Sequence, residues 1–237
     1  MFHASFMPLD RHYESGFGAT ADAFLEAAER LDLGSNNKKF FHSHLPINFL
    51  YRHAIELYLK SLIILIHRRF QLTSGKDSHE PNPRILIENT WKEIHHVHGI
   101  KDLYEFFKTL VITNADQLNA VCQTDWSDIP AELENWINII DDADARSTFL
   151  RYPVTNNAAD HDKSSFKKTS ADQMIAQARS DGKKVMAMLI VDDNDNIVES
   201  FKLDESPLEE LHNSLVEAAK LFSVAHFGMR CELSDGF

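Results

Sequence analysis

The chain has 237 residues, of which 43% are hydrophobic and 25% charged, and its formal net charge is −12 with histidine neutral. These proportions are ordinary for a soluble globular protein, and the length suits one large domain or one domain with an addition. The acidic balance argues against broad, sequence-independent binding to DNA or RNA, which requires a cationic surface. No run of about 18 apolar residues occurs, so the sequence predicts no membrane association through a spanning segment.

The cysteine usage and the first residues of the chain predict a reducing, cytoplasmic location. Cys122 and Cys231 have no spacing typical of a metal site and do not indicate a structural disulfide. The first residues lack the basic-then-apolar order of a secretion signal. No glycine-rich phosphate loop and no Gly-x-Ser-x-Gly elbow is present, and the sequence indicates no cofactor.

Helical signals occupy most of the first 150 residues. Thr20 can cap a helix over residues 21–31, and Pro46 suits the first turn of a second, strongly apolar helix. Because most positions of this second helix are apolar, it is predicted to be the central and most buried one. Residues 68–84 contain one glycine and two prolines among polar residues and predict a loop. Further helices are predicted over residues 101–111 and after Pro130.

The second part of the chain differs in character. Residues 154–168 are polar and predict a linker, whereas residues 184–203 form two β-like runs around an Asp/Asn-rich turn and predict a hairpin. Residues 206–209 have the pattern of a capping box and open a last helix, which is expected to end near Gly228. The predicted fold is therefore mainly α, a helical bundle with a small inserted β-hairpin near the C-terminal helix, in one domain over residues 1–237.

Three charged residues of the central helix, Arg52, Glu56 and Lys60, have i, i+4, i+8 spacing and must share one helix face. Two interpretations are open. In the first, the residues form a solvated ladder of ion pairs, each of which contributes little to stability. Alternatively, a narrow charged stripe on an apolar helix faces a polar cleft, where buried charges would require partners.

Three further clusters resemble metal sites only superficially, and no metal site is predicted. His95, His96 and His98 lie side by side rather than at helical ligand spacing, and no cysteine accompanies them. The acidic residues 141, 142 and 144 are typical of solvated carboxylates near a helix end. The turn at residues 192–196 resembles the start of a calcium loop, but its sixth and twelfth positions are not the glycine and glutamate that such a loop needs.

Three motifs in order resemble the HEPN superfamily of small helical bundles. The first is Ala54-x-Glu56-Leu57-x-Leu59-Lys60, the second His98 followed by Leu103, and the third Arg151-Tyr152-Pro153. The resemblance covers about residues 45–155. It implies a bundle of four or five helices, often paired as a homodimer, and a role in nucleotide or RNA handling within prokaryotic conflict systems such as toxin–antitoxin pairs and phage defence.

One departure from the HEPN pattern bears directly on function. The ribonuclease members carry an arginine, four to six residues and then a histidine, and none of the 13 histidines here has an arginine at that distance. The preferred hypothesis is therefore a non-catalytic module that binds a nucleotide, an RNA element or a partner protein. The residues expected to line its cleft are Glu56, Lys60, His98, Arg146, Arg151 and Tyr152.

Two alternatives remain. The first is a divergent ribonuclease toxin that uses His98 as general acid or base with Arg146 or Arg151 stabilising the charge on phosphorus. The second is a structural assembly subunit, in which the hairpin adds to the sheet edge of a partner.

Overall fold

A computed structural model describes residues 8–35, 44–73, 83–144, 150, 166–170, 173, 187–203 and 206–234. The described residues are mainly helical, which confirms the predicted class, and the chain divides into two compact units. The larger unit comprises residues 1–153 and 212–237, and the smaller one residues 154–211. The interpretation of residues 1–237 as one domain stays a prediction. Among the described residues, no helix has the length and apolar character needed to cross a membrane.

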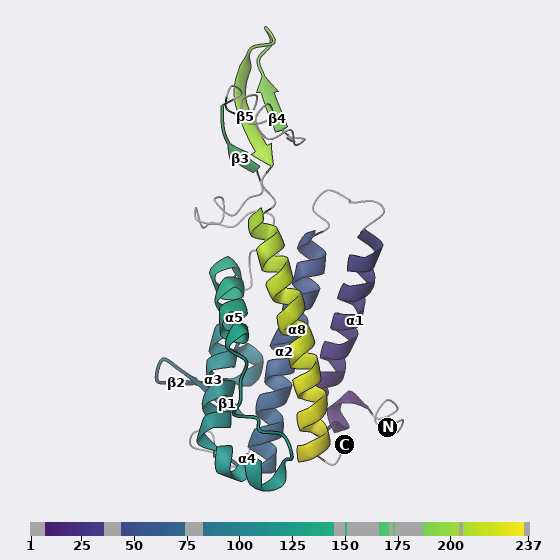
Figure 1. Cartoon of the computed structure of the whole chain (residues 1–237), viewed down its shortest axis with the longest axis vertical. Coiled ribbons are helices and arrows are strands. Elements are labelled where there is room, and N and C mark those ends of the chain that lie inside the picture. The colour runs from purple at the N-terminus through teal and green to yellow at the C-terminus, as the bar shows by residue number, and fades with distance from the viewer. Residues whose placement is uncertain are drawn as a thin grey trace. The chain divides into compact units, whose positions relative to one another are not determined.

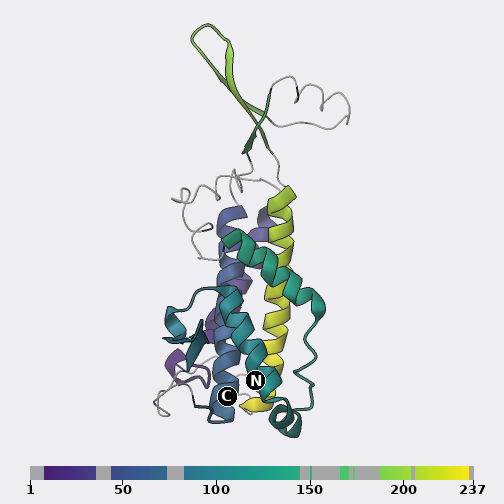
Figure 2. The same ribbon diagram turned by 90° about the vertical axis from the view of Figure 1, so that its left-hand side faces the viewer.

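The larger unit is a helical bundle built around one central helix. Figure 1 shows α1, α2 and α8 running side by side, and Figure 2, turned by a quarter, shows α3 and α5 in front of them. The described α-helices of the chain are α1 (Phe17–Ser35), α2 (His44–Arg69), α3 (Ile100–Thr113), α4 (Ala115–Val121), α5 (Ala131–Asp144) and α8 (Ser206–Leu233).

Helix α2 forms the centre of the core, as its composition predicted. Between Tyr51 and Ile66 every residue except His53 is buried. A helix that is apolar on nearly all sides needs neighbours on all sides. Helices α1 and α3 pack against α2, and α8 contacts it through the rings of His226 and Tyr58 and through the hydrogen bond between His212 and Asn48. The polar residues of α2 are therefore enclosed together with its leucines and isoleucines.

The described residues between α2 and α3 contain elements that the sequence did not indicate, whereas residues 74–82 of the predicted loop 68–84 lie outside the described residues. Helix α2 continues to Arg69, and β1 (Arg84–Ile87) pairs antiparallel with β2 (Thr90–Glu93). The turn between these strands places Glu88 and Asn89 at positive φ, a conformation typical of tight two-residue hairpins. A short 3-10 helix, η3 (Ile94–His96), then leads to α3. Neither this hairpin nor α4 was predicted.

The predicted end of the last helix is wrong. Helix α8 passes through Gly228 and ends at Leu233, because the glycine lies inside the helix rather than after it. A Cβ atom at Gly228 would be 3.0 Å from the ring of Trp126, so the missing side chain allows the indole to approach closely. Glu232, one turn later, accepts a hydrogen bond from Trp126 Nε1 at 2.8 Å and extends this contact.

The predicted hairpin of the smaller unit is confirmed. Strands β4 (Ala187–Val191) and β5 (Ile197–Leu203) pair antiparallel, and Asp192 closes their turn by accepting backbone hydrogen bonds from Asn194 and Asn196. A third strand, β3 (Phe166–Lys168), pairs with β5 and gives the order β3-β5-β4. The sequence predicted that these three residues belong to the polar linker 154–168, and for them this prediction is wrong. The rest of that linker lies outside the described residues.

Candidate functional site

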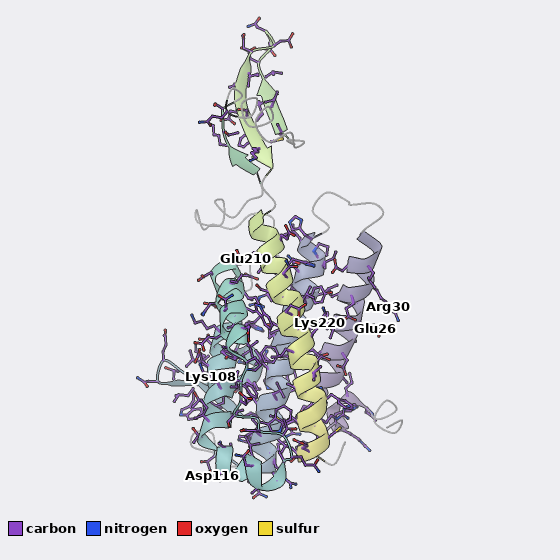
Figure 3. The ribbon with its side chains drawn as sticks, viewed as in Figure 1. Glu26, Arg30, Lys108, Asp116, Glu210 and Lys220 are labelled. Atoms are coloured by element: carbon purple, nitrogen blue, oxygen red, sulfur yellow. The ribbon has the colours of Figure 1, made fainter. Side chains whose placement is uncertain are left out.

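The charged residues of α2 are buried, so the solvated-ladder interpretation is wrong. The side chains of Arg52 and Glu56 are 1% exposed and that of Lys60 is 3% exposed. A solvated pair with the same i, i+4 spacing is present on α1, where Figure 3 shows Glu26 and Arg30 together on the outer side of the helix. The two sets share their spacing but differ completely in environment, because α2 has almost no solvent-facing side.

Glu56 is the centre of the buried network. Its Oε1 accepts hydrogen bonds from Lys60 Nζ and His98 Nδ1, both at 2.9 Å, and its Oε2 lies 3.4 Å from Arg52 Nη1. A carboxylate away from water requires such compensation, since an unpaired buried charge is strongly unfavourable. Glu56 thus has three partners, two from its own helix and one from the segment before α3.

Arg52 connects α2 with two other parts of the bundle. Its Nε lies 3.1 Å from Asp144 Oδ2 in an ion pair with the last residue of α5. Its Nη2 donates a hydrogen bond to the backbone carbonyl of His98 at 2.9 Å. The guanidinium presents several donors in a fixed plane, which suits it to hold three elements at once. Arg52, Glu56, Lys60 and Asp144 contribute two positive and two negative charges, so the network is neutral when His98 is neutral.

Lys60 faces the interior rather than a ligand-accessible surface. Its ammonium group donates to Glu56 and lies 6.0 Å from the centre of the Phe17 ring. The face of an aromatic ring attracts a cation and also excludes water from it. Phe17 in turn stacks on His95, with 6.4 Å between the ring centres. In the described residues Lys60 therefore acts as a buried counter-charge of Glu56.

His98 is the member of the network that reaches solvent. Its side chain is 49% exposed, while Val97 and Ile100 on either side are buried and anchor the segment. Both ends of the residue are held by α2, the carbonyl by Arg52 and the ring by Glu56. An ionised carboxylate only accepts hydrogen bonds, so Nδ1 carries the proton in this contact. Nε2 is then the ring nitrogen available to another partner.

The protonation of Glu56 follows from its surroundings. Burial acts to raise its pKa, but the charge of Lys60 and the hydrogen bonds from Lys60 and His98 together hold the pKa below its ordinary value of 4.5. Glu56 is therefore a carboxylate at neutral pH. As a carboxylate, Glu56 can accept the hydrogen bond that orients the His98 ring.

The structure brings together some of the residues expected at the site. Glu56, Lys60 and His98 form one connected group, whereas Arg146, Arg151 and Tyr152 lie outside the described residues. Sequence reasoning missed the role of Asp144, which it placed among solvated carboxylates. Its spacing contained the signal, because Leu133, Ile137, Ile140 and Asp144 follow one another on the buried face of α5.

No metal site accompanies this group in the part of the chain that the structure describes, because no three His, Cys, Asp or Glu residues there are arranged to hold an ion. Comparisons with protein-family models, with curated proteins and with solved structures find no match to this chain. The proposed function is therefore inferred from the geometry of the network around Glu56 and His98.

We expect Glu56→Gln to destabilise the protein by about 3–5 kcal/mol, because it leaves Arg52 and Lys60 buried with one carboxylate fewer. The free energy of unfolding is measured by urea denaturation. Glu26→Gln is the matched control on the exposed pair of α1 and should change stability by no more than about 0.5 kcal/mol. Equal effects of the two substitutions would contradict the assigned role of Glu56.

The difference in stability between the wild type and Glu56→Gln should depend on pH. The pKa of Glu56 is lowered in the folded state, so its stabilising contribution is complete above the ordinary value of 4.5 and is lost as pH falls through the folded value. The difference should therefore be constant near neutral pH and shrink below pH 4.5. Urea denaturation at several pH values tests this, and a difference that grows on acidification would show that the sign is wrong.

Proposed function

We propose that this protein is a HEPN-like helical module, lacking the usual ribonuclease motif, that binds a nucleotide or a short RNA element at His98. The main supporting observation is the half-exposed imidazole of His98, whose ring is oriented by a hydrogen bond to the buried carboxylate of Glu56. Ordering a side chain before binding reduces the entropy lost on association. His98 would offer Nε2 to a hydroxyl or amide donor of the ligand.

The sequence segment around His98 differs in formal charge from the whole chain. Residues 90–102 contain two lysines, two acidic residues and three histidines, so their formal charge is zero in a chain of net charge −12. Trp91 on β2 is 38% exposed and presents an aromatic surface on which a base can stack. A neutral segment repels a small anionic ligand less than the rest of this acidic chain does, whereas a long nucleic acid would also meet the acidic remainder.

Several finer expectations belong to this proposal. The HEPN resemblance supports a cytoplasmic role in a prokaryotic conflict or phage-defence system, in which a partner protein would be the other class of ligand. The segment after α5 contains Arg146, Arg151 and Tyr152, which would contact the phosphate and the base of the ligand. The end of α5 itself is held by the ion pair between Asp144 and Arg52.

We expect His98→Ala to weaken the binding of ATP or of a labelled single-stranded RNA of about eight nucleotides by roughly tenfold, the loss of one or two hydrogen bonds. Fluorescence anisotropy and calorimetry at low salt measure the affinities. His96→Ala is the matched control, because this neighbouring side chain is 75% exposed and its described contacts, with Glu93 and the ring of His95, lie outside the Glu56 network. No binding by the wild type, or equal affinities of both variants, would remove His98 from the proposal.

A second function is favoured by the same contact between Glu56 and His98. A carboxylate that fixes the tautomer of a histidine is the arrangement that prepares its other nitrogen for general base catalysis. In a divergent ribonuclease, Nε2 would take the proton of a 2′-hydroxyl group while its oxygen attacks the adjacent phosphorus and the 5′-oxygen departs. Arg146 or Arg151 would stabilise the charge that develops.

Incubation of the purified protein with total RNA separates the two functions. The preferred proposal predicts no cleavage by the wild type, by His98→Ala or by His96→Ala. Cleavage by the wild type and by His96→Ala that is lost in His98→Ala would instead establish the ribonuclease.

A further inference from the structure

The three-stranded sheet of the smaller unit exposes apolar side chains on both of its faces. All five residues of β4 are exposed, and Met188, Leu189, Ile190 and Val191 each retain between 44 and 51% of their accessible surface. Successive residues of a strand point to opposite faces, so both faces of β4 keep apolar side chains that the described residues leave about half exposed. A sheet of this size normally needs a packed face to be stable.

Strand β4 also lies at an edge of the sheet. The order β3-β5-β4 leaves its outer side unpaired among the described residues. Natural proteins usually protect such an edge with a charge, a proline or a bulge. The sequence of β4 has neither a charge nor a proline, and its pairing with β5 is regular from Ala187 to Ile190 and shifts register only at Val191, the last residue of the strand. In the described part of this unit, the edge from Ala187 to Ile190 is therefore open to pairing with another strand.

The charges around β4 are distributed unequally along the strand. Its C-terminal end leads into the turn that carries Asp192, Asp193 and Asp195. At its N-terminal end, Ala187 lies opposite Lys202 of β5, and Lys202 lies opposite Lys167 of β3. Among the described residues, one end of the sheet therefore carries aspartates and the other carries lysines.

We propose that β4 pairs antiparallel with β4 of a second copy of this chain, which joins the two sheets into one of six strands. An antiparallel pair places the acidic turn of each copy beside the basic end of the other, where opposite charges attract. A parallel pair would place like charges together. When the strand ends coincide, Leu189 lies opposite the same residue of the second copy.

This arrangement accounts for the composition of β4 without depending on the ligand proposed at His98. Pairing removes the open edge and doubles the number of strands, and the apolar side chains of the two β4 strands contact each other across the new ladder. A partner protein with a complementary edge is the other possible occupant. It would not explain why the two ends of one sheet complement each other.

Sedimentation velocity of the full chain over a range of concentrations tests the proposal. We expect a dimer whose dissociation constant rises at least about tenfold in Leu189→Lys, which places two like charges opposite each other. Val198→Lys is the control, because Val198 is 62% exposed on the central strand β5 and not at the edge. A wild type that is monomeric throughout, or a dimer weakened equally by both substitutions, would overturn the proposal.

A charge exchange tests the orientation of the strands and leaves β4 unchanged. Asp193→Lys and Lys202→Glu should each weaken the dimer, and the double variant should recover most of the loss because the complementary ends are exchanged. Circular dichroism confirms that each variant is folded. A double variant weaker than both single variants would exclude the antiparallel arrangement.

Discussion

Glu56 lies where a carboxylate is least easily accommodated, in the middle of a helix whose residues are almost all buried. Its charge is tolerated because Lys60, Arg52 and His98 surround it, and Asp144 balances the second cation. Removing any one of the four charged members, Arg52, Glu56, Lys60 or Asp144, would leave an uncompensated charge in the core. The network therefore specifies how α2, the end of α5 and the segment before α3 come together, in addition to any stability that it provides.

The same network determines the orientation and the tautomer of the His98 ring. A surface histidine ordinarily samples several rotamers and both tautomers, whereas this ring is held through Nδ1 by Glu56 and its backbone carbonyl by Arg52. The buried charges thus define the position and the hydrogen-bonding capacity of one exposed nitrogen. Binding and acid–base chemistry both begin from such a group, and binding is the function that we propose for this chain.

Much of the fold could be predicted, because it depends on local patterns. The density of leucine and isoleucine indicated the buried α2, and the Asp/Asn-rich turn indicated the hairpin of β4 and β5. Contacts between distant residues could not be predicted in the same way. His98 and Glu56 are 42 positions apart, and the i, i+4, i+8 spacing of the charges fits a solvated face as well as a buried one. The four-residue strands β1 and β2 are too short to give a distinct periodicity.

The buried carboxylate of Glu56 fixes the tautomer of His98 through the hydrogen bond from Nδ1. Nitrogen-15 chemical shifts of the two imidazole nitrogens, recorded by NMR at a pH where the ring is neutral, report which one carries the proton. The structure predicts a protonated Nδ1 and an unprotonated Nε2 in the wild type. A ring protonated at Nε2 and unprotonated at Nδ1 would contradict the hydrogen bond from His98 to Glu56 and the role of this carboxylate in orienting the ring.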